Sequence, residues 1–149
     1  VLGAAFHLMI SLTLVLSGVA LIGPGLALSV LWLPVVLLPV LLLLLGCSWV
    51  FSALGVFFRD IAPLLQFLSV ALMFASAVFY SAHTIPPELW TYMRFNPILL
   101  AIELARDAAL WSRPLNLHHL AYLYVFGVAA CYFGHAAFRR LRPAFADVL

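Results

Sequence analysis

Five histidines and five acidic side chains are the residues whose types could carry acid–base chemistry in this 149-residue chain. If the chain were a membrane-embedded transferase, its candidate general acids and bases would be His83, His118, His119, Glu103 and Asp107. His118 and His119 are adjacent, so they cannot share one helix face, and no pair of histidines has the His-x-x-x-His spacing of a metal site. We therefore predict no catalytic residue and no metal-binding residue.

One common type of nucleotide-binding site, the Gly-x-x-x-x-Gly-Lys phosphate loop, is excluded in this chain. All seven basic residues are Arg, and a Gly-x-x-x-x-Gly-Lys phosphate loop needs a Lys. We expect no cofactor in this chain, so any ATP would be bound by another chain. Cys47 and Cys131 lie inside apolar runs and are interpreted as small packing residues rather than as a disulfide. The formal net charge of +2 is too small to indicate a nucleic-acid partner.

The composition predicts an integral membrane protein. The chain is 67% hydrophobic and 8% charged, whereas a soluble domain is about half apolar and about a quarter charged. A membrane-spanning helix needs about 20 mostly apolar residues. Because no basic segment precedes the first apolar run, we expect the natural protein to be longer at its N-terminus. Four spans are predicted, over about Ala4–Ile22, within Leu26–Phe58, over about Ile61–Ala82 and over about Leu117–Phe138.

Breaks between and within these spans follow from a few residues. Gly23-Pro24-Gly25 predicts a turn, and Pro34 and Pro39 predict kinks in the second span. The charged pair Arg59-Asp60 stands between two uncharged runs and marks a membrane surface, with Asp60 as N-cap of the third span. The last span carries small residues suited to close helix packing, namely Gly127, Ala129, Ala130 and Gly134.

Residues 83–116 predict two short helices, over about Pro87–Phe95 and Pro97–Trp111. Pro86-Pro87 followed by Glu88 puts proline in the first turn and an acid at the positive end of the helix dipole. Asn96 is the expected N-cap of the second helix, with Pro97 at its first position.

The second of these helices is apolar with a narrow charged stripe. Glu103, Arg106 and Asp107 share one face, by their i, i+3, i+4 spacing. Such a helix lies in the membrane interface, or dips into the membrane with its charges towards protein or water. The opposite face holds Ile98, Ala101, Ala105 and Ala108.

The charges also predict an orientation. Two spans separate the Arg59 turn from the tail cluster Arg139, Arg140 and Arg142, so both lie on one side of the membrane. The positive-inside rule makes that side cytoplasmic, and residues 88–113 are then extracytoplasmic.

The order of several motifs resembles that of type-2 ABC exporter permeases, with polysaccharide and polyol-phosphate exporters (O-antigen, capsule, teichoic acid) as the closest subgroup. The resemblance covers about residue 50 to the C-terminus, and the first two spans match in general pattern. It is carried by the segments Ala53–Ile61, Ile85–Leu89, Phe95–Pro97, Glu103–Asp107 and Phe138–Asp147.

The resemblance implies an all-α, polytopic membrane helix bundle. Residues 1–149 would form one transmembrane permease domain, corresponding to spans three to six of a six-span family fold. The two short helices before the last span would be a re-entrant pair at the outer mouth.

The function implied by the resemblance is that of a permease subunit, not an enzyme. It would move a polysaccharide, a lipid-linked glycan or a polyol phosphate out across the bacterial cytoplasmic membrane. Its partners would be a second copy of the permease, the lipid bilayer and an ABC ATPase subunit, which would hold the ATP and Mg. A drug or lipid exporter of the same superfamily, a membrane-embedded transferase and a purely structural membrane subunit remain as alternatives.

The candidate site residues fall into three groups. Arg59 and Asp60 form a cytoplasmic turn near the ATPase subunit. Phe74, Phe79 and Tyr80 are candidates for the translocation path, because aromatic faces suit sugar rings and lipid tails. Packing and anchoring at the membrane interface are the alternative roles of each aromatic. The outer gate helices would contribute Pro86, Pro87, Trp90, Tyr92, Phe95, Asn96, Pro97, Glu103 and Arg106.

Overall fold

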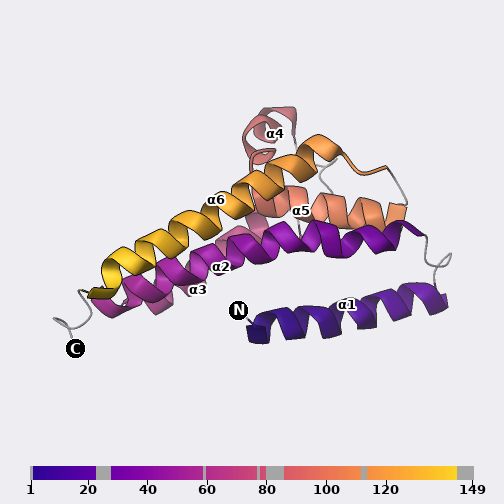
Figure 1. Ribbon diagram of the computed structural model, residues 1–149. Coiled ribbons are helices and arrows are strands. Elements are labelled where there is room, and N and C mark those ends of the chain that lie inside the picture. Colours follow the sequence, from indigo (N-terminus) through magenta and orange to yellow (C-terminus); the bar gives the residue numbers. More distant parts are fainter. Residues whose placement is uncertain are drawn as a thin grey trace.

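The computed structural model describes residues 2–22, 28–58, 60–76, 78–79, 86–111 and 114–143, and every regular element in this part of the chain is helical (Figure 1). The predicted all-helical fold class is thereby confirmed. The Gly23-Pro24-Gly25 turn, Arg59, Tyr80, His83 and the tail beyond Pro143 lie outside the described residues. The elements are α1 (Leu2–Ile22), the 3-10 helix η1 (Leu28–Trp32), α2 (Leu33–Phe57), α3 (Ile61–Ala75), α4 (Pro87–Met93), α5 (Pro97–Arg106), the π-helical turn η3 (Asp107–Trp111) and α6 (Leu117–Leu141).

Three helical stretches in the described residues are long and apolar enough to cross a membrane, at Leu2–Leu21, Ser29–Phe57 and Leu117–Leu141. The apolar helix α3 has 15 residues, which at 1.5 Å per residue reach about 22 Å, less than the roughly 30 Å hydrocarbon core. We expected this helix to continue to Ala82, and that end was wrong, because the chain leaves the helix at Ser76. The count of four spans therefore stays a prediction.

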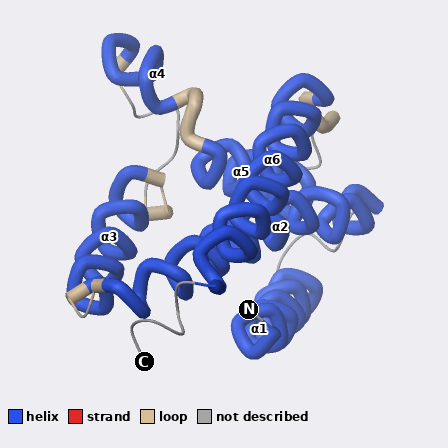
Figure 2. Tube along the Cα trace, turned by 60° about the vertical axis from the view of Figure 1, so that its left-hand side comes forward, coloured by secondary structure: helices blue, strands red, loops and turns tan. Residues whose placement is uncertain are grey.

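Helices α2 and α6 form the central pair of the molecule, and they lie side by side in Figures 1 and 2. Their closest approach is at glycines: a Cβ on Gly134 would overlap the carbonyl of Gly46, and a Cβ on Gly127 would stand 2.5 Å from the carbonyl oxygen of Pro39. Small residues allow the backbones of membrane helices to approach closely, so that dispersion contacts hold them together. The packing role predicted for Gly127 and Gly134 is confirmed.

The two helices of this pair run in the same direction. Going along the chain, Pro39 of α2 meets Gly127 of α6, and Trp49 further on meets His135. The ends of α2 and α6 therefore lie on one side of the molecule, as the sequence predicted for the segments that follow them. The intervening chain must return to the other side before α6 begins.

The two prolines of α2 play different roles. Pro39 lies inside the helix and has no N–H, so the carbonyl of Val35 loses its usual i+4 donor. The hydroxyl of Tyr124 on α6 donates to that carbonyl at 2.9 Å and replaces the missing bond. Pro34 occupies the first turn of α2, where a proline costs no hydrogen bond. The kink predicted at Pro34 was wrong, because the α-helix begins there after the 3-10 helix η1.

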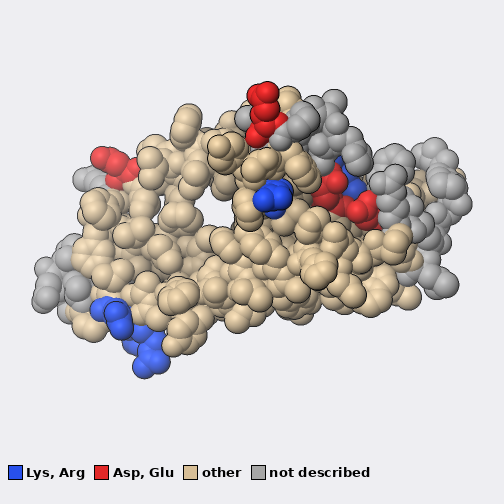
Figure 3. Space-filling view, turned by 90° about the horizontal axis from the view of Figure 1, so that it is seen from above, with Lys and Arg blue, Asp and Glu red and all other residues tan. Residues whose placement is uncertain are grey.

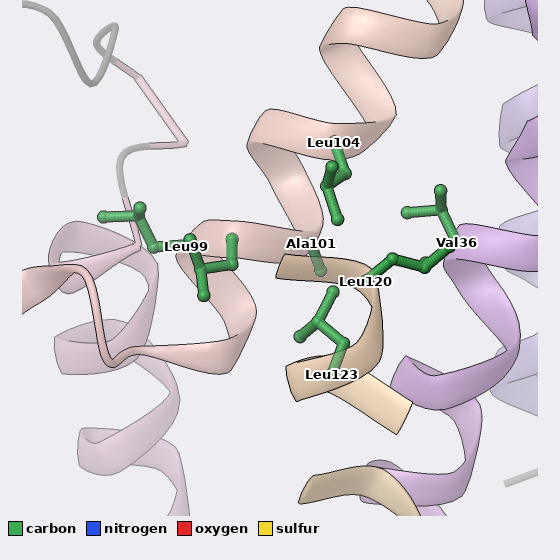
Figure 4. Packing of buried hydrophobic residues seen from close by; sticks show 7 residues of the cluster. Val36, Leu99, Ala101, Leu104, Leu120 and Leu123 are labelled. Atoms are coloured by element: carbon green, nitrogen blue, oxygen red, sulfur yellow. The ribbon is translucent and has the colours of Figure 1, made fainter. Parts of the chain in front are cut away.

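The hydrophobic core is built where α5 packs against α2 and α6 (Figure 4). By contrast, none of the described side chains of α1 or α3 is buried. Helix α5 thus belongs to the packed unit, whereas α1 and α3 present their apolar surfaces outwards. The buried cluster consists of Val36, Leu99, Leu100, Ala101, Leu104, Leu120 and Leu123.

Adding one methyl group at the α2–α6 contact is expected to destabilise the protein. Gly134→Ala should lower the midpoint of thermal unfolding in detergent micelles, because overpacking costs about 1–3 kcal/mol. Gly18→Ala is the matched control, since a Cβ at Gly18 meets nothing within 4 Å and alanine favours a helix by about 0.5–1 kcal/mol. Equal midpoints for the two variants would contradict the close contact.

Candidate functional site

Asn96 joins the end of α3 to the start of α5. Its side-chain oxygen accepts a hydrogen bond from the N–H of Ile98 at 3.0 Å, which is the N-cap bond that the sequence predicted. Its side-chain nitrogen donates to the carbonyl of Ala75 at 3.2 Å and to the hydroxyl of Ser76 at 3.4 Å. Ser76 is 1% exposed. One amide therefore supplies an acceptor to one helix end and a donor to another.

Arg106 makes a second connection between α5 and the segment after α3. Its guanidinium donates to the carbonyl of Val78 at 2.8 Å and lies 3.8 Å from the carboxylate of Glu103. Both charged side chains are about a quarter exposed. An exposed i, i+3 ion pair contributes about 0.2–0.5 kcal/mol, whereas a hydrogen bond from a charged donor contributes about 1.5–3 kcal/mol. The Val78 bond is also exposed to solvent, so its contribution falls at the lower end of that range.

Phe74 and Phe79 lie beside these two connections. Their ring centroids are 6.0 Å apart with the planes tilted by 45°, and the side chains are 58% and 69% exposed. The structure therefore brings two of the three candidate path residues together on an exposed surface, next to the helix pair formed by α4 and α5. The third, Tyr80, lies outside the described residues.

The aromatics of the helix pair separate into packing and exposed residues. Trp90 is half-buried and packs against the hydrophobic cluster, so it acts here as a packing residue. Tyr92 and Phe95 are 79% and 58% exposed, and the Arg94 guanidinium lies 4.9 Å from the centre of the Phe95 ring. Tyr122 of α6 donates to the carbonyl of Phe95 at 2.8 Å and ties the end of α4 to the bundle.

The proline positions agree with the predicted helix starts. Pro86 precedes α4 as its N-cap residue, Pro87 is the first residue of α4, and Pro97 is the first residue of α5. Asp60 occupies the N-cap position of α3, but its side chain makes no capping hydrogen bond. The capping role predicted for Asp60 was wrong: its backbone (φ −92°, ψ 12°) is not in the extended conformation typical of a side-chain cap.

Figure 3 shows the charged side chains in two groups. One group lies at the end of the molecule where α6 finishes, and the other lies over α4 and α5. The surface between them carries no Lys, Arg, Asp or Glu on the face shown. This distribution fits a protein whose middle is surrounded by lipid.

Three hydrogen-bonding residues of this region were not identified from the sequence. Ser76 and Tyr122 are described above, and Ser29 of η1 donates to the carbonyl of Ala108 in the π-helical turn η3 at 2.7 Å. π-Helical turns interrupt the regular ladder and occur frequently at functional sites. A hydroxyl side chain within an apolar segment indicates that the residue has a hydrogen-bond partner, but the sequence does not show which carbonyl accepts the bond.

Among the acid–base candidates, the carboxylate of Glu103 lies beside the guanidinium of Arg106. The backbone N–H groups of His118 and His119 donate to the side-chain oxygen of Asn116 at 3.1 and 3.4 Å. Asn116 thereby caps α6, a role that the sequence analysis missed. Within the described residues there is no group of three or more His, Cys, Asp or Glu that could hold a metal ion.

With this geometry in place, comparison with known proteins decides the family. The family model described as "ABC-2 type transporter" matches residues 1–110, about three quarters of the chain. The chain belongs to the ABC-2 type transporter family.

Two relatives of this ABC-2 family protein are named as polysaccharide transport proteins. The polysialic acid transport protein KpsM of Escherichia coli is 30% identical over 70% of this chain and 41% of its own length. The O-antigen export system permease protein RfbA of Klebsiella pneumoniae is 24% identical over 96% of this chain and 55% of its own length. The chain thus spans about half the length of the curated relatives that it matches. No solved structure matches it.

Asn96→Asp should separate the two roles of Asn96 in the ABC-2 chain. Aspartate still caps α5, because its oxygen can accept from the N–H of Ile98, but it has no donor for the carbonyl of Ala75. We expect the distance distribution between spin labels on α3 and α5 to broaden, with little loss of helix content by circular dichroism.

Asn116→Asp is the control for this experiment, because the oxygen of Asn116 caps α6 and aspartate preserves that bond. Its distance distribution should match that of the unmodified protein. An unchanged distribution in Asn96→Asp would show that the bond to Ala75 does not hold α3 and α5 together.

Proposed function

We propose that this chain is part of the membrane permease of an ATP-driven exporter. The cargo is a polysaccharide, a lipid-linked glycan or a polyol phosphate, and it moves out across the bacterial cytoplasmic membrane. The observation that carries the proposal is the family match together with two polysaccharide transport relatives, which align over 70% and 96% of the chain.

The permease itself performs no covalent chemistry in this proposal. The chain has no Lys and therefore no Gly-x-x-x-x-Gly-Lys loop, so a separate ABC ATPase subunit binds ATP and Mg. Arg59 and Asp60, between α2 and α3, are the candidate contact with that subunit. Two permease copies pair to enclose the path, and the uncovered side chains of α3 are the surface that supports this pairing.

Phe74 and Phe79 are the candidate path residues, with Tyr80 following them in the sequence. Their exposed rings offer flat apolar faces that stack on sugar rings without requiring a particular sugar sequence. Asn96 and Arg106 tie the backbone next to these rings to α5. In the proposal, a displacement of α3 during export is transmitted through these two side chains to the helix pair α4–α5, which forms the outer gate.

A fourth span is supported by the direction of the central pair. Because α2 and α6 run in the same direction, the chain between Phe57 and Leu117 must return across the molecule. Helix α3 is the apolar element that begins this return. In the proposal, α3 and the chain between it and α4 cross the membrane together, because α3 alone is shorter than the hydrocarbon core, and α4 and α5 form a re-entrant pair on the far side.

Deleting the gene tests the function directly. Cells that depend on this gene should lose the surface glycan and accumulate its lipid-linked precursor on the inner side of the membrane, and the gene on a plasmid should restore export. An intact surface glycan with altered resistance to drugs would instead indicate a drug exporter of the same family.

The same complementation assay tests the connection made by Arg106. Arg106→Ala should reduce export about tenfold, because its exposed bond to Val78 contributes about 1.5 kcal/mol, the lower end of the range for a charged donor. Glu103→Gln should have a smaller effect, since the quarter-exposed ion pair contributes about 0.2–1 kcal/mol. If Arg106→Ala exports at the wild-type rate, at an equal protein level in the membrane, Arg106 has no role in the gate.

The proposed orientation places the Arg-rich end of α6 in the cytoplasm. In a Cys47→Ala, Cys131→Ala background, Tyr92→Cys should react with an impermeant thiol reagent in intact cells, and Asp60→Cys and Arg140→Cys should react only after the cells are opened. All three positions are exposed in this chain. Labelling of position 60 but not of position 92 in intact cells would reverse the orientation.

A further inference from the structure

Beside the close contact of α2 and α6 the two helices leave an open groove of about 350 Å³. The groove is mostly apolar, and one of its walls carries aromatic rings. The rings of Trp49 and His135 lie 4.7 Å apart between their centroids, with their planes tilted by 57°. The lining residues are Leu42, Trp49, Val128, Cys131, Tyr132 and His135.

The groove leads to a cationic end. Val128, Tyr132, His135 and Arg139 follow one another at spacings of four, three and four residues, so they share one face of α6. Arg139 is exposed and lies one turn beyond His135, in the last turn of the helix. Arg140 is exposed too, but it is one residue further on and so points about 100° away from this face.

The length of this face fits half of a membrane. From Val128 to Arg139 the helix rises about 16 Å, at 1.5 Å per residue, and half of the hydrocarbon core is about 15 Å. An acyl chain of one leaflet would therefore extend along the groove and leave its headgroup at Arg139. Charge favours an anionic headgroup, because the described residues at this end include three Arg and one acid, Asp60.

We propose that this groove is a binding site for an anionic phospholipid of the bilayer. One acyl chain lies against Leu42, Trp49, Val128 and Cys131, and the phosphate lies at Arg139. Tyr132 and His135 line the groove between its apolar part and the turn that carries Arg139, and their rings offer apolar surface to the acyl chain. A second protein helix would need no cation at this position, and a zwitterionic lipid would gain less from it, because its own cation offsets the charge of its phosphate.

Trp49 is an intrinsic reporter for this site. In the full chain with the other three tryptophans replaced (Trp32→Phe, Trp90→Phe and Trp111→Phe), the fluorescence of Trp49 is recorded in phosphatidylcholine vesicles. These vesicles contain a minor fraction either of acyl-brominated phosphatidylglycerol or of acyl-brominated phosphatidylcholine. The brominated phosphatidylglycerol should quench Trp49 several times more effectively, because it accumulates in the groove.

Two arginine variants distinguish a site from general surface charge. Arg139→Gln should lower the preference for phosphatidylglycerol about fivefold, the ratio that corresponds to about 1 kcal/mol per Arg near a membrane surface. Arg140→Gln removes the same charge from the same turn but from another face, and it should leave the preference nearly unchanged. Circular dichroism checks that both variants keep their helix content.

Three results would overturn the proposal. Equal quenching by the two brominated lipids would show an ordinary lipid contact without selection. An equal loss of preference in both arginine variants would show general surface charge. Absence of quenching by either lipid in the inserted protein would show that another protein surface covers the groove.

Discussion

The close approach of α2 and α6 at Gly46 and Gly134 is the contact on which the remaining structure depends. Between membrane helices there is little hydrophobic driving force, because lipid tails are as apolar as leucine side chains, so dispersion contacts and hydrogen bonds must hold them together. Removing the Cβ from both sides of the contact lets the backbones meet. Since the two helices run in the same direction, the intervening chain has to fold back, and α5 fills the space beside the pair with its leucines.

Several of the polar side chains of this apolar chain bond to the irregular points of its helices. Tyr124 supplies the donor that Pro39 withholds from Val35, Ser29 reaches the π-helical turn, and Tyr122 reaches the end of α4. Backbone carbonyls without partners are costly in a membrane, because no water is available to satisfy them. A proline kink or a helix end therefore persists where a neighbouring element provides a hydroxyl, an amide or a guanidinium.

This principle also connects the fold to the proposed function. Asn96 and Arg106 satisfy carbonyls at the end of α3 and beyond it, and both residues belong to α5, or to its cap, which is packed into the core. Helix α3 is bonded at its last residue, Ala75, to the side chain of Asn96, and it buries no side chain of its own. A helix attached in this way can shift without disrupting the core, which is the property that an alternating path requires.

The periodic and compositional features of this chain could be predicted from the sequence alone. Long apolar runs determine the helices, the spacing of Glu103 and Arg106 places them together, and Asn96-Pro97 marks a helix start, because all three depend on local geometry. The end of α3, the role of Pro34 and the partner of Pro39 were decided by tertiary structure. The end of α3 and the partner of Pro39 depend on donors from residues distant in the sequence, namely Asn96 for Ala75 and Tyr124 for Val35. The role of Pro34 depends on where the 3-10 helix η1 ends and α2 begins. The groove beside Trp49 likewise depends on how α2 and α6 pack together, because the spacing within either helix alone does not show which face will be covered.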